Sequence, residues 1–328
     1  MRISCRLGRL GAAVAAAALA LLVTASLAAV QTDGFVVFRG SAANPWYRMA
    51  PDGTGGATSI GPADGGNWWV TDVSRGQTPA TVLLQSTGTA PLTIYAMPAT
   101  GGTPVALLGA GDPSPAQAAT FLSDGVHIGY IVNDADNIST LHVGTIARDT
   151  AGNVVAVTDS SPVYEAPAGQ LMTSVTFAPD GLRAVVGLRA ASNDWHLWLL
   201  TAGGAGWTAE RLTSASVIMD RWPRWSPVAD LVVFERDEYI RNSQQNNVWI
   251  YDLATRTERQ LTTKSNWGNA NGGYREHPAW SKNGAYVMFS GKNSKNGYDL
   301  YQIRTDGAEK AIQVTSTSGS ELYPAWGW

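Results

Sequence analysis

Cysteine, charge and long apolar runs are all scarce in this chain of 328 residues. It has one cysteine, 15% charged residues and a formal net charge of -3. Because it has no surplus of Lys and Arg to neutralise phosphates, we expect no nucleic-acid partner. The single cysteine, Cys5, lies at the N-terminus, so we expect neither disulfides nor thiol chemistry in the body of the protein. Beyond that terminus no apolar run approaches the roughly 20 residues of a membrane helix, which predicts no membrane span.

The N-terminal segment has the pattern of a secretory signal peptide. Three arginines come first, followed by an Ala/Leu-rich run at 10–23 and by small residues at Ser26 and Ala28. This order predicts cleavage after Ala28, which would leave a mature chain of 29–328 in the periplasm or outside the cell. The alternative is an uncleaved anchor, but a run so rich in Ala and Gly makes a weak membrane span.

A strand motif recurs six times along the chain. Its copies carry an aromatic residue or a histidine at the equivalent position: Tyr47, Tyr95, His142, Trp198, Tyr251 and Tyr301. Successive copies stand 47 to 56 residues apart, which is close to the length of one propeller blade. The spacing therefore predicts six structural repeats.

A second motif, an aromatic residue before a tight turn, precedes the first one. Its clearest copies are Phe121, Phe177, Trp225 and Trp280, and they lead into predicted strands at 127–132, 182–188, 231–235 and 285–290. Short fourth strands are predicted at 210–213, 258–262 and 313–315. The Asp-Gly and Asn-Gly pairs supply the positive φ that hairpin turns need. Each repeat is thus predicted to be a four-stranded antiparallel meander, with its recurring aromatic residue in the core.

The motifs follow one another in a fixed order: an aromatic residue with Ser-Pro-Asp-Gly, a strand, Leu-Tyr and then Gln-Leu-Thr. This order resembles the repeat of the TolB-type six-bladed β-propeller family. The resemblance runs through the mature chain, is strongest over 172–328 and is weakest in the second repeat, at 69–84. TolB also has an N-terminal α/β domain, for which 29–34 leaves no room, so only the propeller is matched. The resemblance implies a binding module for a protein or peptide partner in the cell envelope.

The two ends of the chain are predicted to complete one blade together. The C-terminal 323–328 copies the innermost-strand sequence at 277–280, and 35–38 resembles the second strand at 286–289. Their pairing would remove the exposed sheet edge that a ring otherwise keeps. We therefore predict an all-β fold: a single, monomeric domain, 29–328, forming a six-bladed propeller closed by its terminal strands. A many-stranded β-sandwich is the alternative.

Candidate binding residues lie at the entries to the predicted innermost strands, where a charged residue stands three positions before Pro. Long connections over a rigid scaffold usually carry binding sites. Five are expected on the same face, at 61–68, 109–118, 214–224, 237–247 and 263–278. The residues expected at the channel mouth are Asp220, Arg221, Arg275, Glu276, His277, Glu321 and Tyr323. They predict recognition of a polar ligand or peptide; the alternative is a solvated rim with structural ion pairs.

Two aromatic residues of a polar, Asn/Gly-rich loop complete the candidate site, Trp267 and Tyr274. They have no counterparts in the other repeats, so we expect them to stack on a sugar or to dock a partner. The alternative is that these two side chains only hold the loop in place.

Signals of catalysis and of metal or cofactor binding are missing. The sequence contains no Gly-x-Ser-x-Gly elbow, which argues against a serine hydrolase. Three of the four histidines fall in predicted strands of separate repeats, which argues against a three-histidine metal site. The segment 133–137 alternates oxygen ligands but lacks the Gly and the distal Glu of a calcium loop. We therefore expect no catalytic residue, no metal and no cofactor.

Two functions remain open at this point. The first is a non-enzymatic scaffold that binds a protein or peptide, and the alternative is a carbohydrate-binding or carbohydrate-active propeller, either glycosidase or lyase. Carboxylates of Asp220, Glu276 and Glu321 that converge about 5 to 10 Å apart would favour a glycosidase. Carboxylates that are spread around the rim and paired with Arg221 and Arg275 would favour binding.

Overall fold

The computed structural model describes most of the chain after its N-terminal segment. The described residues are 31–40, 46–61, 68–86, 92–109, 112, 115–190, 194–213, 218–240, 243–263, 275–292 and 297–328. Every regular element in these ranges is a strand, and none of them holds a helix that is long and apolar enough to cross a membrane. The predicted signal peptide, 1–28, lies outside the described residues.

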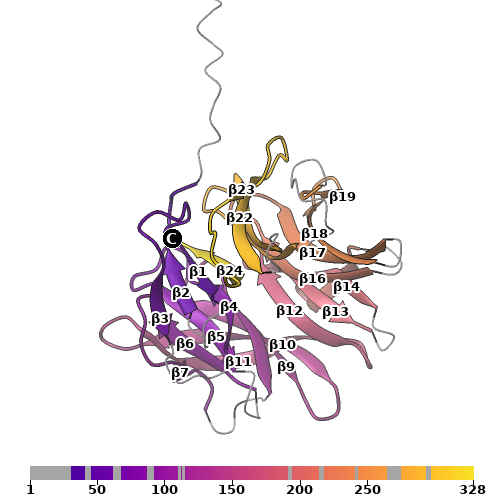
Figure 1. Cartoon of the computed structure of the whole chain (residues 1–328). Coiled ribbons are helices and arrows are strands. Elements are labelled where there is room, and N and C mark those ends of the chain that lie inside the picture. The colour runs from indigo at the N-terminus through magenta and orange to yellow at the C-terminus, as the bar shows by residue number, and fades with distance from the viewer. Residues whose placement is uncertain are drawn as a thin grey trace, which may run out of the picture.

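The strands form four-stranded antiparallel meanders that follow one another along the chain (Figure 1). The first sheet has the order β24 (Leu322–Gly327), β1 (Phe35–Arg39), β2 (Trp46–Met49), β3 (Thr58–Gly61). The second has the order β4 (Trp68–Val73), β5 (Thr81–Ser86), β6 (Ile94–Pro98), β7 (Val105–Ala106). The third comprises β8 (Ala116–Phe121), β9 (His127–Asn133), β10 (Ser139–Arg148), β11 (Val154–Glu165).

The next sheet has eight strands and consists of two such meanders. One contains β12 (Leu171–Phe177), β13 (Arg183–Arg189), β14 (Trp195–Gly203), β15 (Gly206–Arg211). The other contains β16 (Ile218–Trp225), β17 (Leu231–Ile240), β18 (Ser243–Asp252), β19 (Thr257–Gln260). A single parallel pair, Trp195 with Met219, joins the two. The last sheet is β20 (Arg275–Trp280), β21 (Tyr286–Lys292), β22 (Tyr298–Arg304), β23 (Ile312–Gln313).

The predicted pairing between the two ends of the chain is present. Strands β1 and β24 are antiparallel neighbours, with Phe35 opposite Gly327 and Val37 opposite Ala325. The indole N–H of Trp326 also donates a hydrogen bond of 3.0 Å to the carbonyl of Asp33. The first sheet is therefore built from both ends of the chain.

Apolar side chains fill the spaces between consecutive meanders. The recurring aromatics of the turn motif are buried as predicted, each at most 7% exposed: Phe121, Phe177, Trp225, Trp280 and Trp326. One hydrophobic cluster joins Met288 of β21 to Val36 of β1, and so packs the last meander against the first sheet. Burial of these aromatic faces supplies a large part of the hydrophobic stabilisation.

The prediction of a long connection at 237–247 was wrong. Strands β17 and β18 extend through this range as one hairpin, in register as far as Ile240 opposite Ser243. The polar side chains of Asp237, Asn246 and Asn247 in this hairpin are buried and form an ion pair or hydrogen bonds, so the strands can stay paired while each of these side chains has a polar partner. Strand β16 likewise begins at Ile218, inside the connection predicted at 214–224.

Each strand that begins a meander contains a β-bulge. The register with the second strand shifts in β4, β8, β12, β16, β20 and β24. In three of these strands the bulge includes a proline, which has no N–H to donate to the ladder: Pro223, Pro278 and Pro324. A bulge re-aims one side chain of the strand. Here the bulged positions of all these strands face one pocket.

Candidate functional site

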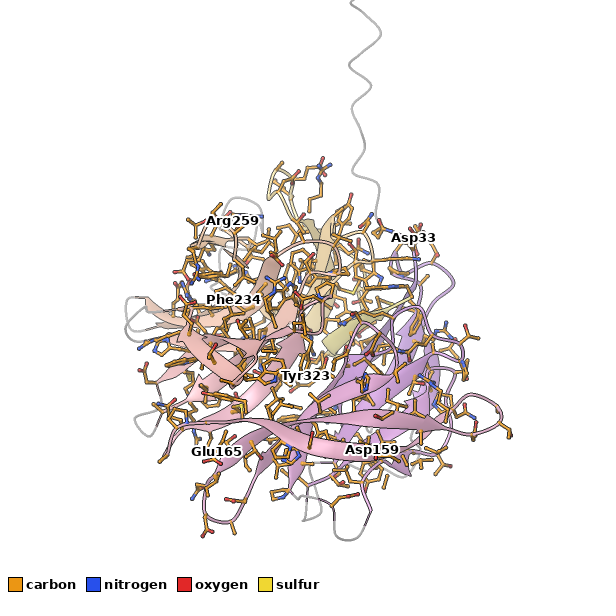
Figure 2. The ribbon with its side chains drawn as sticks, turned by 180° about the vertical axis from the view of Figure 1, so that it is seen from behind. Asp33, Asp159, Glu165, Phe234, Arg259 and Tyr323 are labelled. Atoms are coloured by element: carbon orange, nitrogen blue, oxygen red, sulfur yellow. The ribbon has the colours of Figure 1, made fainter. Side chains whose placement is uncertain are left out.

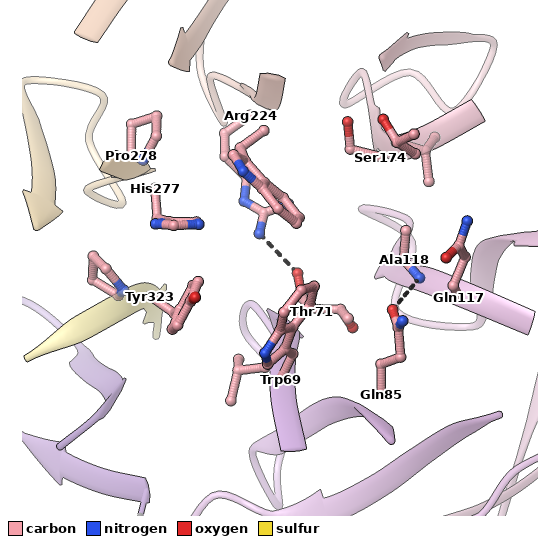
Figure 3. Close-up of a pocket in the computed structure, with 15 residues that line it drawn as sticks. Trp69, Thr71, Gln85, Gln117, Ala118, Ser174, Arg224, His277, Pro278 and Tyr323 are labelled. Carbon is pink, nitrogen blue, oxygen red and sulfur yellow. Dashed lines mark hydrogen bonds between the residues drawn. The ribbon is translucent and has the colours of Figure 1, made fainter. Parts of the chain in front are cut away.

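The bulged strands enclose a pocket of about 60 Å³ in the middle of the molecule (Figure 3). Every one of them contributes to its wall: β4 through Thr71, β8 through Ala118, β12 through Thr173, β16 through Trp222, β20 through His277 and β24 through Tyr323. Figure 2 shows Tyr323 near the centre of the molecule and Asp159 and Arg259 farther out. All these meanders thus meet at the pocket.

Four rings form a closed cycle at this pocket. Trp69 lies 6.2 Å from Trp222 and 6.0 Å from Tyr323, measured between ring centroids. His277 completes the cycle, 5.1 Å from Trp222 and 4.1 Å from Tyr323. We call these four residues the ring cluster. Such contacts hold the rings in fixed orientations and leave an apolar wall with a few polar edges.

The backbone conformation at the bulges turns three of these rings toward the pocket. Trp222, His277 and Tyr323 have φ of 52°, 56° and 57°, and Ala118 of β8 has 53°. A non-glycine residue in this left-handed region costs roughly 1–2 kcal/mol. Residues held this way cluster at functional sites, where the surrounding structure over-determines their conformation.

A guanidinium lies among the polar groups of the pocket. Arg224 of β16 donates a hydrogen bond of 2.8 Å to the carbonyl of Thr71 on β4, and its own carbonyl accepts one of 2.8 Å from the indole of Trp280. Burial lowers the pKa of Arg224, and the charge of Asp72 opposes this effect. Arg224 forms no ion pair within the described part of the chain.

Three more polar atoms of the lining have no hydrogen-bond partner among the described residues. They are the hydroxyl oxygens of Thr71 and Ser174 and the Nδ1 atom of His277. Burial, together with the charges of Arg221 and Arg224, holds the pKa of His277 well below its usual value, so its ring is neutral at pH 7. These atoms can therefore accept or donate hydrogen bonds to a bound molecule.

A cluster of carboxylates lies beside the ring cluster. Arg221 pairs with Glu235 at 3.0 Å and with Asp237 at 2.5 Å, and the amide of Asn246 donates to Glu235 and Glu276 at 3.1 and 3.3 Å. Burial raises the pKa of Glu276 to about 7, the charge of Arg221 opposes this, and the charge of Asp237 adds to it. Burial likewise raises the pKa of Glu235.

The other predicted charged residues have separate partners. Asp220, which is fully buried, accepts hydrogen bonds of 2.7 and 3.1 Å from Arg236, and Arg236 also pairs with Glu258. Arg275 donates to Asn247 at 2.6 Å. The side chains of Asp220, Arg236 and Arg275 tie neighbouring strands together and are buried, which differs from the solvated rim considered as the alternative for this site.

Of the sequence-predicted site, two residues, His277 and Tyr323, line the central pocket. Glu321 instead accepts a hydrogen bond from Thr317 and lines a different cavity of about 440 Å³. Asp220, Arg221, Arg275 and Glu276 belong to the ion-pair and hydrogen-bond networks just described. Trp267 and Tyr274 lie outside the described residues.

The carboxylates of Asp220, Glu276 and Glu321 do not share a partner. Asp220 binds Arg236, Glu276 binds Asn246, and Glu321 binds threonine hydroxyls. Arg221 pairs with Glu235 and Asp237 rather than with Asp220, Glu276 or Glu321. No cluster of three His, Cys, Asp or Glu side chains suited to a metal ion occurs within the ranges that the structure describes.

Sequence reasoning missed Trp69, Trp222 and Arg224. Trp222 could have been found, because it stands before Pro223 as His277 and Tyr323 stand before their prolines. Arg224 and Trp69 have no counterpart in the other repeats, so no spacing signal marks them. Only the convergence of the bulged strands reveals that they share a pocket.

No family model and no curated protein matches this sequence. Solved structures that are similar to it include TolB from Acinetobacter baumannii, with 15% identity and a TM-score of 0.64, over 90% of this chain and 67% of that one. A chain of the nidogen/laminin complex has 8% identity and a TM-score of 0.60, over 89% and 97% of the two chains. Oligogalacturonate lyase in complex with manganese has 13% identity and a TM-score of 0.52, over 88% and 75%. At these identities the likeness concerns the fold, which is the TolB-like propeller that the repeats predicted.

Proposed function

We propose that residues 29–328 form an exported, monomeric six-bladed propeller that binds a protein or peptide partner at its central pocket and catalyses no reaction. The count of six blades is supported by the bulged strands that meet at the pocket, and closure of the ring by the pairing of β1 with β24. The periplasm or the exterior of the cell is the proposed location, from the signal-peptide pattern at 1–28.

The observation that carries the binding function is the ring cluster. Three of its members are held in a conformation that costs backbone energy, yet they turn their side chains toward the central pocket. Aromatic side chains in a desolvated pocket are the usual anchors of protein recognition. The fold occurs both in TolB and in a protein–protein complex, the nidogen/laminin complex, which supports this function.

The carbohydrate-active alternative has less support. Its chemistry needs two carboxylates on opposite sides of the scissile bond, and those of Asp220, Glu276 and Glu321 are each bound to different partners.

Capture of the partner tests the proposal. The protein 29–328, immobilised, is exposed to the envelope fraction and culture medium of its source, beside the variants Trp222→Ala and Tyr323→Ala. We expect a stoichiometric protein or peptide on the wild type that both variants lose, because each removes one ring of the cluster. The control Trp207→Ala removes a partly buried ring of β15, which does not line the pocket, and should retain the partner.

A glycan array run in parallel tests the alternative. Saturable glycan binding that Trp267→Ala abolishes, with no protein captured, would replace our proposal by the carbohydrate function. A protein captured equally by the wild type and both pocket variants would place the binding surface elsewhere.

A further inference from the structure

The guanidinium of Arg224 lies in the pocket without a counter-ion among the described residues. Among the described residues it makes one hydrogen bond, to the backbone carbonyl of Thr71, although a guanidinium carries five N–H donors. The side chain is half-buried, and withdrawing a cation from water is unfavourable unless it is paired and hydrogen-bonded. This residue therefore has unused capacity to bind an anion.

The opposite charge that acts on Arg224 is that of Asp72, while Arg75 acts as a like charge. The carboxylate of Asp72 is already engaged, since it accepts hydrogen bonds from Thr120, from the backbone N–H of Phe121 and from Arg75. Among the described residues, Asp72 is therefore bound to partners other than Arg224.

The neighbouring pocket atoms are those that would complete an anion site. The hydroxyls of Thr71 and Ser174 have no partner among the described residues, and both can donate to an oxyanion. The side-chain amides of Gln85 and Gln117 line the same cavity. Figure 3 shows Arg224 directed at Thr71 between Trp69 and His277.

The size of the cavity narrows the class of anion. About 60 Å³ has room for a few water-sized groups, which matches a carboxylate and the first atoms of its stem. A single guanidinium matches one negative charge in a planar, two-oxygen geometry. The ring cluster would then cover the apolar part of the same ligand.

We propose that Arg224 receives the carboxylate of the bound ligand, with the hydroxyls of Thr71 and Ser174 on its oxygens and the ring cluster around its apolar stem. This inference rests on the proposed function, because it names the chemical group that the partner places in the central pocket. That group can come from the C-terminus of a peptide or from an Asp or Glu side chain.

Calorimetric titration with a matched pair of small probes tests the inference. The acid is 3-phenylpropanoate, and its neutral counterpart is 3-phenylpropanamide, which has the same shape without the charge. We expect the wild type to bind the acid at least about tenfold more tightly than the amide, since a charge-assisted hydrogen bond is about twice as strong as a neutral one. Equal binding of both probes, or no binding of the acid, would overturn the proposal.

Substitutions test whether Arg224 causes the preference for the acid over the amide. Arg224→Gln should abolish the difference between acid and amide, while Arg304→Gln, an exposed arginine paired with Asp306, should preserve it. Ser174→Ala removes a hydroxyl that has no described partner, so folding should be unaffected while the preference for the acid weakens by a few-fold. A preference that survives both pocket variants would contradict the assignment, whether or not Arg224→Gln folds well.

Peptide probes distinguish the two sources of the carboxylate. They are acetyl-Gly-Gly-Phe with a free C-terminus, the same peptide as its C-terminal amide, and acetyl-Gly-Glu-Phe amide. Tight binding of the first alone indicates a C-terminal carboxylate, and tight binding of the third indicates a side chain. Equal binding of the neutral amide would overturn the inference.

Failure of this inference is separable from failure of the proposed function. If Arg224→Gln still captures the partner that Trp222→Ala loses, the pocket binds a protein but not through a carboxylate. If the acid binds as expected and no protein or peptide is ever captured, the carboxylate site stands and the protein-binding function is wrong.

Discussion

At the scale of single residues, conformation and burial determine what the pocket contains. The left-handed backbone at the bulges decides which side chain faces the cavity, and burial decides which protonation state that side chain adopts. His277 illustrates both, since its φ is 56° and its pKa lies well below the usual value because it is buried.

Ala118 is the bulge residue at which backbone strain can be measured without removing a side chain of the ring cluster. It has φ of 53°, so Ala118→Gly should relieve roughly 1–2 kcal/mol of left-handed strain, against about 0.5–1 kcal/mol for the greater freedom of glycine in the unfolded chain. We expect a free energy of unfolding that is unchanged or raised by up to about 1.5 kcal/mol, measured by urea titration. The control Ala184→Gly, fully buried in β13, should lose roughly 1–2 kcal/mol. Equal losses in both variants would contradict strain at the bulge.

Glu276 should make stability depend on pH. Its pKa is about 7 in the folded protein because of burial, whereas the unfolded carboxyl loses its proton near pH 4.3. Between these values the folded state holds more protons, so stability should fall as pH rises, by at most about 1.4 kcal/mol per pH unit. Glu276→Gln should flatten this slope, followed as the melting temperature from pH 4.5 to 7.5. The exposed Glu165→Gln of β11 serves as the control and should keep the wild-type slope.

His277 should act in the opposite direction. Its folded pKa is depressed, so the unfolded state takes up a proton below about pH 6.5 that the folded state does not, and stability falls as pH decreases. Comparison of His277→Asn with Glu276→Gln over the same pH range separates the two contributions. If neither variant changes the profile, the pKa shifts do not govern stability.

At the scale of elements, polar side chains join one sheet to the next. The bulges free backbone N–H groups, and side chains of the neighbouring sheet accept from them: Gln85 of β5 from Ala118 at 3.0 Å, and Glu235 of β17 from His277 at 3.2 Å. A buried N–H without a partner is costly, so the bulge and its acceptor depend on each other. This gives the buried Glu235 a structural role independent of any ligand.

Asp72 provides the test of such a link. Its carboxylate, on β4, accepts 2.7 and 2.9 Å hydrogen bonds from Thr120 and the N–H of Phe121 on β8. Asp72→Ala leaves both donors unsatisfied in a buried place, so we expect a loss of roughly 2–4 kcal/mol of stability. Denaturant titration measures it, with Asp136→Ala in an exposed turn as a control that should stay within about 0.5 kcal/mol of the wild type. A similarly small loss at Asp72 would mean that other contacts hold these sheets together.

At the scale of the whole molecule, the first sheet depends on both ends of the chain. Strand β24 pairs with β1, supplies Trp326 to the core and supplies Tyr323 to the pocket. Without it β1 would become an exposed edge, which invites association with other chains. The integrity of the fold and that of the site are therefore linked through these last residues.

A chain that ends at Glu321 should therefore lose its cooperative thermal transition or associate into larger species. Circular dichroism and light scattering after size exclusion would detect either outcome. A chain that lacks 1–28 but keeps β24 is the control, and it should remain monomeric and melt cooperatively. A truncated chain that melts like this control would show that the pairing of the two ends is dispensable.

Much of the fold could be predicted from the sequence because the repeats carry local signals. Alternation in strands and Gly-containing turns at fixed offsets placed β9, β13 and β21 to within about two residues of their observed bounds. These local signals did not predict the full length of β17 and β18, which continue as a hairpin through the range predicted to be a connection. There the buried partners of polar side chains, distant in sequence, decide the length of the strands.

The strand meanders, the pairing of the two ends and the aromatic core could be derived from the amino-acid sequence, because each of these follows from residues that recur at fixed spacing. The composition of the site emerged from the three-dimensional packing. Bulges and contacts between distant sheets decide that Asp220 faces Arg236 instead of a ligand. They also decide that Trp222 and Arg224 share a cavity with Tyr323. Such contacts join residues far apart in the chain and leave no period in the sequence.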